Sequence, residues 1–375
     1  MVGDDLASSP LQLGRFRLSS DFTRKPSIMS LLLLSSASTP PPPSRWDLTI
    51  DGKAYRLNGE LWTYAGSTDF KMARLLADGV DVSPVVRQRK SAGANAVRLF
   101  DYVPVKDWGN TAWDSPSIAD TVAAIRWLNA QGLFVELTLL TDDDPNRIPP
   151  AIRLIEAVSG LRLGLRLEAG NEPNTHKSIN THALIPAMQA SGYQWSTGDY
   201  ENSAYWRGTF GTFHPARTFD FVRRAHDAYE YWNGGGPNSP SEPPCRVPWD
   251  NDEPIRPDQC GFDRVALRAH GGATKQFCGG GTAHTESGKF SRLWTEPEES
   301  CVREFYRGLH AFPAGIQNSP DYRRIVEPGN EPGGPREFAR TYVVGNSMVR
   351  CQQVGTACPE PGWTSLDEDG ILWTR

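Results

Sequence analysis

The sequence predicts one (β/α)8 TIM barrel, in which eight parallel strands alternate with helices. Strand-like and helix-like patterns alternate along residues 61–191 and give four β/α units. The chain has 375 residues, a length that suits one barrel with insertions better than several domains. We expect an N-terminal β-hairpin before the barrel and a small irregular β extension after it.

Three regions differ in composition. Residues 1–45 are rich in Ser and Pro, contain four consecutive prolines and show no regular periodicity, which predicts a disordered extension. Residues 46–312 hold the barrel pattern. The remaining residues, 313–375, begin with a stretch of Gly, Pro and polar residues, and we expect an irregular segment. Within it, residues 339–351 have a hairpin pattern that either closes the barrel or begins a small β appendage.

The first half of the chain is regular. Two alternating runs across an Asp-Gly turn predict a hairpin within residues 46–59, which would plug the bottom of the barrel. Strands are then predicted at 61–66, 94–100, 133–140 and 161–170. Helices are predicted at 69–79, up to Gly93, at 118–132 and at 149–160.

The second half is less regular. The pattern predicts a fifth strand at 206–213, a sixth at 245–249 and a seventh at 277–288. Helices are expected at 216–232, 262–272 and 298–309. No eighth strand is evident.

Charge and hydropathy exclude several classes of protein. The net charge is −5 and Lys and Arg are scattered, so we expect no nucleic-acid partner. No apolar run approaches the roughly 18 residues that span a bilayer, so we expect no membrane span. A short Leu run after Lys25 is weak support for a signal peptide, and we expect a secreted or extracellular protein. Oligomeric state is left open.

The six cysteines show no zinc-binding spacing, and we expect no metal and no cofactor. Cys245 with Cys260, and Cys351 with Cys358, are spaced to close loops as disulfides. The other two, Cys278 and Cys301, are interpreted as buried thiols.

Three glutamates follow predicted strands, at the end where barrel side chains converge on one mouth. Glu172 follows strand four, Glu253 follows strand six and Glu286 follows strand seven. Two carboxyl groups about 5 to 5.5 Å apart are what retaining cleavage of a glycosidic bond requires, with one protonated and one ionised. Their mutual repulsion separates their pKa values, so one residue type serves both roles.

The Asn-Glu-Pro motif after strand four and the Glu after strand seven resemble clan A, the retaining barrel glycosidases that include cellulase-like enzymes. The resemblance covers roughly residues 46–312 and implies that Glu172 is the general acid/base. It further implies that Asn171 binds the sugar 2-hydroxyl and that Glu286 is the nucleophile. A second Asn-Glu-Pro copy begins at Asn330 but follows no strand.

The same resemblance implies that Arg98, near the end of strand two, steadies the nucleophile, and that His214 contacts substrate. His284 lies two residues before Glu286 and so points to the same side of its strand. For sugar stacking we predict the tryptophans next to strands, which are Trp62, Trp206, Trp249 and Trp294.

Alternatives remain for several residues. If Arg98 has a purely structural role, it pairs with Asp101 or Glu136. If predicted strand six is really the seventh, Glu253 becomes the nucleophile. It is otherwise a substrate contact or an ion-pair partner of Arg256. Strand four alternates Leu with Arg and Gly, unlike most strands covered on both faces. Carboxylate partners for an interior Arg162 or Arg166 are not evident.

Three functions are compatible with these residues. The favoured one is a retaining glycoside hydrolase that acts on oligo- or polysaccharides with β linkages. The alternative is a catalytically inactive glycan-binding barrel, suggested by the irregular strand four and by the lack of a Tyr after strand six. A metal-dependent hydrolase with Glu253 and His214 or His284 as ligands is disfavoured because the ligand spacing is absent.

Overall fold

The computed structural model describes residues 46–104, 113–173, 179–198, 206–213, 247–252, 280–284 and 291–311. It also describes Leu267, Gly271, Thr274, Ala314 and four short strands beyond residue 321. The predicted N-terminal extension, residues 1–45, lies outside the described residues, as does nearly all of the helices expected at 216–232 and 262–272.

Eight strands form one sheet, and every paired neighbour in it is parallel. In chain order the strands are β4 (Tyr64–Thr68), β5 (Ala96–Phe100), β6 (Phe134–Leu140), β7 (Leu165–Gly170), β8 (Trp195–Ser196), β9 (Gly211–Phe213), β10 (Trp249–Asn251) and β11 (Gly280–His284). The first strand, β4, lies between β5 and the last strand, β11. The two edge strands of the sheet are β8 and β9. Residues that lead into β9 bond to β8, as in the hydrogen bond of 2.8 Å from the Thr209 N–H to the Trp195 carbonyl. The sheet is therefore a nearly closed (β/α)8 barrel, as predicted.

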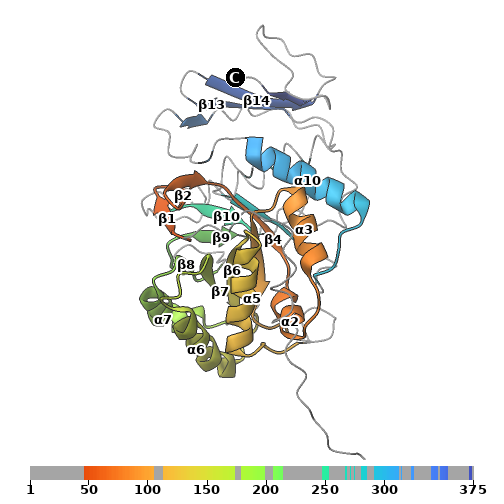
Figure 1. The fold of residues 1–375 in the computed structure, drawn as a ribbon. Helices are drawn as coiled ribbons and strands as arrows, with labels where there is room; N and C mark the ends of the chain where they lie inside the picture. The colour runs from red at the N-terminus through yellow and green to blue at the C-terminus, as the bar shows by residue number, and fades with distance from the viewer. Residues whose placement is uncertain are drawn as a thin grey trace, which may run out of the picture. The chain divides into compact units, whose positions relative to one another are not determined.

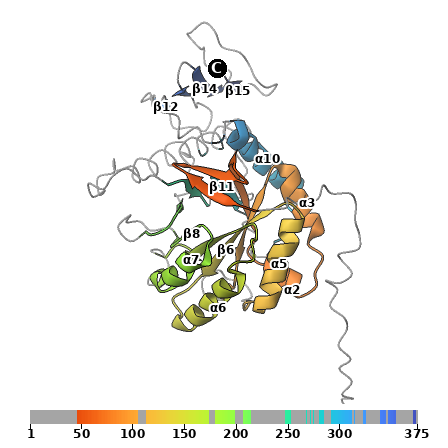
Figure 2. The same ribbon diagram turned by 60° about the vertical axis from the view of Figure 1, so that its left-hand side comes forward.

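Helices cover the outside of the strands (Figure 1). They are α2 (Met72–Ala77), α3 (Ser83–Ala92), α5 (Ile118–Ala130), α6 (Ile148–Val158), α7 (Ile185–Ser191) and α10 (Glu296–Ala311), with short 3₁₀ turns η1 (Pro145–Arg147) and η2 (Thr181–Leu184). Figure 2 shows α2, α3 and α5 on one side and α6 and α7 on another. All five helices predicted within these residues are confirmed. Gly93 ends α3 with a φ of 117°, a conformation that favours glycine.

Alternation along each strand separates two environments. Odd-numbered residues such as Val97, Leu137 and Leu167 join one apolar cluster with side chains from the helices. Even-numbered residues point the other way, into the barrel, because successive strand side chains face opposite sides. These interior positions hold charged residues, including Arg98 and Arg166, which are both fully buried. The Leu-Arg alternation of strand four therefore follows from a polar barrel interior.

The strand numbering predicted for the second half is wrong by one. The fifth barrel strand is β8, a two-residue strand ahead of the predicted one, and the sixth is β9. The region predicted as strand six is therefore the seventh, β10, and the region predicted as strand seven is the eighth, β11. A two-residue strand is too short to show any periodicity, which explains the missed element.

A three-stranded antiparallel sheet precedes the barrel. Its strands are β1 (Leu48–Asp51), β2 (Ala54–Leu57) and β3 (Glu60–Trp62), and the predicted hairpin is β1 and β2. From β2, the buried Tyr55 donates a hydrogen bond to Asp250 in the barrel interior. The hairpin thus plugs one end of the barrel. The predicted first strand divides in two, because Trp62 belongs to β3 and the barrel strand begins at Tyr64.

The C-terminal region contains a separate four-stranded antiparallel sheet. Its strands pair in chain order as β12 (Tyr322–Arg324), β13 (Ala339–Val344), β14 (Ser347–Gln353) and β15 (Ile371–Trp373). The hairpin predicted at 339–351 forms β13 and β14 and belongs to this sheet, so it does not close the barrel. Among the described helices, none has both the length and the apolar character needed to cross a bilayer.

Candidate active site

Asn171 and Glu172 stand directly after the fourth barrel strand, as predicted. The Asn171 N–H donates to the Leu140 carbonyl at 2.9 Å, which holds the strand end against β6. Asn171 is buried and Glu172 is partly exposed. Glu172 has a φ of 43°, in the left-handed region that non-glycine residues rarely adopt. Strained backbone of this kind is concentrated at functional sites.

Arg98 connects two sides of this end of the barrel. Its Nη2 donates to Asn171 Oδ1 at 3.1 Å, and its Nε lies 3.7 Å from Asp252 Oδ2. Asn171 and Asp252 are the residues directly before Glu172 and Glu253. Among the described residues, the fully buried Nη1 of Arg98 has no hydrogen-bond partner. One guanidinium therefore contacts the chain at the ends of the fourth and seventh strands and keeps one donor available.

Glu168 is the main ion-pair partner of Arg98 and was missed by the sequence analysis. It accepts hydrogen bonds from Nε and Nη2 of Arg98, and from the hydroxyls of Thr138 at 2.6 Å and Thr212 at 3.0 Å. A purely structural role of Arg98 predicted an ion pair with Asp101 or Glu136. Among the described contacts, Arg98 forms an ion pair with neither. The sequence did contain a signal for Glu168, because Glu168 and Arg166 are two residues apart and therefore share the inward face of one strand.

Carboxylates keep Arg98 charged. Burial lowers its pKa, but the nearby Glu168 and Asp252 outweigh burial and raise the pKa above its ordinary value. Glu136, Glu168 and Asp252 place carboxylate oxygens within 4.8 Å of one another, a group that by residue type fits a cation. The Arg98 guanidinium already supplies positive charge to two of its three members.

A second buried network lies deeper in the barrel around Arg166. This side chain pairs with Glu136 and Asp250, the partners that sequence reasoning did not identify. Its guanidinium also stacks on the Tyr64 ring, 3.7 Å from the ring centroid. Burial raises the pKa of Asp250 to about 7, against the lowering effect of Arg166. The other candidate interior residue, Arg162, is exposed.

Asp101 follows the second barrel strand on the same side as Glu172. It is 5% exposed and accepts a hydrogen bond from the Ser115 hydroxyl at 2.6 Å. Burial raises the pKa of Asp101 to about 6, although that hydrogen bond lowers it. This carboxyl group therefore titrates in mildly acidic solution.

The tryptophans predicted to stack on sugar rings pack against other side chains. Trp62 packs against Phe134, the first residue of β6, with ring centroids 5.3 Å apart, which places it at the opposite end of the barrel from Glu172. Trp249 begins β10, is 7% exposed and packs against Trp206. Trp294 is 4% exposed, and the Arg89 guanidinium lies 3.6 Å from its ring centroid. Trp249 and Trp294 therefore leave little ring surface for a sugar, whereas Trp62 and Trp206 are partly exposed.

The remaining predicted residues fall in parts of the chain that are not described. His214, Glu253 and Glu286 lie outside the described residues, and only the backbone of His284 is described, at the end of β11. Strand order still locates them in the chain. His214 directly follows the sixth strand, Glu253 follows the seventh by two residues and Glu286 follows the eighth by two.

Comparison with solved structures agrees with this architecture. A glycoside hydrolase family 5 protein from Bacteroides vulgatus ATCC 8482 matches with a TM-score of 0.55 and 12% identity, over 82% of this chain and 80% of that one. The chain has the barrel fold of a family 5 glycoside hydrolase. A second structure, described as a glycoside hydrolase, matches with a TM-score of 0.56 and 12% identity, over 84% and 85% of the two chains. No protein-family model matches the sequence, and no curated protein matches it either.

Proposed function

We propose that this protein is a retaining glycoside hydrolase that cleaves β-linked glycans, with Glu172 as general acid/base and Glu253 as nucleophile. One observation carries the proposal: Asn171 and Asp252, which precede these two glutamates, contact the same Arg98 guanidinium. Because both segments contact one side chain, we infer that the two glutamates share the same part of the barrel mouth. The fold of family 5 glycoside hydrolases supports this assignment.

The corrected strand order favours Glu253 over Glu286. The resemblance to clan A assigns the nucleophile to the glutamate after strand seven, and the seventh strand is β10. Glu286 follows the eighth strand, and we propose that it contacts substrate, together with His214 and His284. The buried Arg98 Nη1, which has no partner among the described residues, is a suitable donor to the ionised carboxylate of a nucleophile.

The reaction proceeds in two steps. Glu253 attacks the anomeric carbon while Glu172 gives its proton to the leaving oxygen, which breaks the glycosidic bond and forms a glycosyl-enzyme ester. Glu172 then removes a proton from water, which attacks the same carbon and releases Glu253. Asn171, held by Arg98, is placed to hydrogen-bond the sugar 2-hydroxyl. Two displacements at one carbon retain its configuration.

Azide rescue tests the two roles separately. Glu253→Gly should lose turnover of dinitrophenyl β-glycosides and, with sodium azide, should form the α-glycosyl azide, because azide enters from the nucleophile's face. Glu172→Ala should form the β-glycosyl azide, because azide attacks the glycosyl-enzyme from the opposite face. Glu286→Gly is the matched control and should give no α-azide.

Two results would contradict this proposal. If Glu286→Gly forms the α-azide and Glu253→Gly does not, the nucleophile follows the eighth strand. If the wild-type protein binds oligosaccharides but hydrolyses no member of a panel of aryl glycosides, the protein is a glycan-binding barrel. The irregular strand four no longer favours that alternative, because in the barrel interior Arg166 pairs with Glu136 and Glu168 pairs with Arg98.

We also propose a secreted or extracellular location. Cys301, interpreted from the sequence as a free thiol, is disulfide-bonded. Structural disulfides persist in oxidising compartments such as the extracellular space. Detection of the protein in the medium of its native host by an antibody would test this location.

A further inference from the structure

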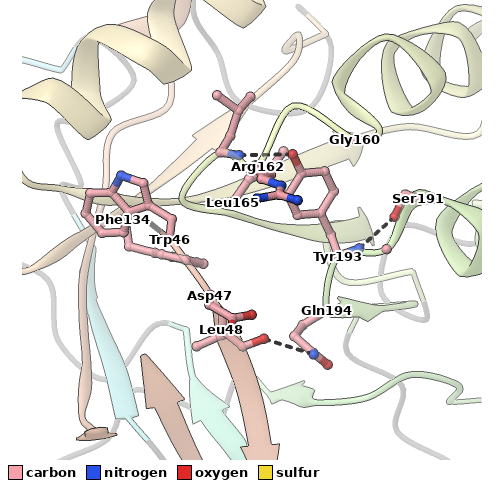
Figure 3. Close-up of a pocket in the computed structure, with 12 residues that line it drawn as sticks. Trp46, Asp47, Leu48, Phe134, Gly160, Arg162, Leu165, Ser191, Tyr193 and Gln194 are labelled. Atoms are coloured by element: carbon pink, nitrogen blue, oxygen red, sulfur yellow. Dashed lines mark hydrogen bonds between the residues drawn. The ribbon is translucent and has the colours of Figure 1, made fainter. Parts of the chain in front are cut away.

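A cavity of about 270 Å³ opens at the end of the barrel opposite Glu172 (Figure 3). Phe134 and Leu165, the first residues of β6 and β7, line it, and so does Gln194, which directly precedes β8. Glu172 lies beyond the far end of β7. A strand rises about 3.3 Å per residue, so a six-residue strand separates the two places by roughly 20 Å. The cavity is distinct from the proposed active site.

One wall of the cavity carries a cation, Arg162, that has no ion-pair or hydrogen-bond partner among the described residues. Arg162 is exposed, and it forms no ion pair or hydrogen bond with any residue in the described part of the chain. Figure 3 shows it beside Tyr193, and Trp46 and Phe134 together across the cavity. The Tyr193 hydroxyl donates to the Val158 carbonyl and accepts from the Leu163 N–H, which fixes the ring in place.

The rest of the cavity lining offers aromatic surface and a hydrogen-bonding side chain. The Trp46 and Phe134 ring centroids are 6.1 Å apart, and Trp46 is only partly buried. The Gln194 amide nitrogen donates to the Leu48 carbonyl at 3.1 Å, which fixes the orientation of this side chain. Rings with fixed polar groups beside them suit a ligand that has both apolar faces and hydroxyl groups.

The backbone around Arg162 is strained. Arg162 has a φ of 52°, and Gly160 and Gly192 in the same cavity have φ values of 75° and 79°. At both glycines an added Cβ would meet nothing within 4 Å, so glycine is favoured there by its backbone conformation and not by lack of space. Arg162 adopts a similar conformation without being glycine, and no described hydrogen bond of its side chain compensates. Strain kept at a cavity wall is a reason to look for a function there.

We propose that this cavity binds a sugar unit that carries a carboxylate, such as a hexuronate residue, as a second and non-catalytic glycan site. A guanidinium binds a carboxylate through two parallel hydrogen bonds. The aromatic rings would cover the apolar face of the sugar ring, and the volume suits a small ligand of one or two sugar units. This inference does not depend on the proposed hydrolase activity.

Calorimetric titration with methyl β-glucuronide tests the site, with methyl β-glucoside and sodium acetate as the comparison ligands. We expect the glucuronide to bind at least tenfold more tightly than either, because only it combines the ring with the carboxylate. Arg162→Gln should weaken glucuronide binding at least tenfold. Arg153→Gln changes an exposed arginine of α6 that does not line the cavity, and it should leave binding unchanged.

A parallel set of measurements separates this site from the active site. Glu172→Gln should bind the glucuronide as the wild type does, and Arg162→Gln should keep wild-type turnover of aryl β-glycosides. Equal binding of glucuronide and glucoside, equal binding of acetate, no effect of Arg162→Gln, or loss of binding in Glu172→Gln would each overturn the proposal. If no aryl glycoside is hydrolysed, the hydrolase proposal fails while the binding result still stands.

Discussion

Two buried arginines in the barrel interior have similar surroundings but differ in which nitrogen has no hydrogen-bond partner among the described residues. Arg166 donates from both terminal nitrogens, to Tyr55, Asp250 and Glu136, and its Nε has no partner among the described residues. Arg98 donates from Nε and one terminal nitrogen, and its Nη1 has no partner among the described residues. Arg166 lies at the plugged end of the barrel, whereas Arg98 contacts the chain next to Glu172.

This difference suggests that one buried arginine serves stability and the other serves activity. At the plugged end, rings also enclose the guanidinium of Arg166, with Tyr64 and Phe210 centroids 3.7 and 4.2 Å away. Toward the mouth, the partners of Arg98 include residues at strand ends, and its terminal Nη1 has no partner among the described residues, whereas both terminal nitrogens of Arg166 are bonded. We therefore expect substitutions at Arg166 to change stability and substitutions at Arg98 to change activity.

The largest expected effect is on stability at the plugged end. Arg166→Met leaves Glu136 and Asp250 buried without their cation, and we expect the free energy of unfolding to fall by about 3–5 kcal/mol. Urea denaturation followed by circular dichroism measures this loss. Arg74→Met is the matched control, because the Arg74–Asp78 ion pair is exposed and such pairs contribute about 1 kcal/mol or less. Equal losses of unfolding free energy in the two variants would contradict the prediction that the buried ion pairs of Arg166 stabilise the fold more than the exposed pair of Arg74.

Arg98→Lys should affect activity more than stability. The substitution keeps the charge but cannot reproduce the paired contacts to Glu168 and Asn171, so we expect kcat/KM on an aryl β-glycoside to fall about 100-fold, or roughly 3 kcal/mol. Steady-state kinetics measures this effect. Arg166→Lys, in the other network, should lose stability with a smaller loss of activity in the folded fraction. The opposite order of effects would contradict the functional role of Arg98.

Asp101 should give stability a measurable pH dependence. Its pKa is raised to about 6 in the folded protein, so the folded state holds a proton that the unfolded state releases near pH 4. Its contribution to stability is therefore greatest below pH 4 and is lost as the pH rises through 6. Asp101→Asn should increase the free energy of unfolding by on the order of 2 kcal/mol at pH 8 relative to pH 4. Denaturation at several pH values, compared with wild type, would show whether this slope is removed.

The smallest expected effect is at Trp62. Because Trp62 packs against Phe134 at the plugged end, Trp62→Phe should leave KM for an oligosaccharide within about twofold and lower stability by about 1 kcal/mol. Kinetics and thermal denaturation measure the two quantities. A tenfold increase in KM would show that this ring contacts substrate after all.

Local patterns predicted much of the first half of the fold. The hairpin, the helices from α2 to α6 and the strand ends at Phe100 and Gly170 follow from periodicity, glycine stops and turn residues, which are all short-range signals. The strand that local patterns do not predict, β8, has two residues, and its place depends on bonds to its neighbours. A single missed strand changed the number of every strand after it, and with it the nucleophile that strand order favours.

By itself, the sequence determined that a barrel forms and that Asn171 and Glu172 follow its fourth strand, because alternation and turn chemistry are encoded within a few residues. Only the tertiary structure decided which carboxylates surround Arg98 and Arg166 and which glutamate follows the seventh strand. The partners of these arginines lie up to 154 residues away along the chain, as for Arg98 and Asp252. Ion pairing between distant strands depends on closure of the barrel, and no local pattern records it.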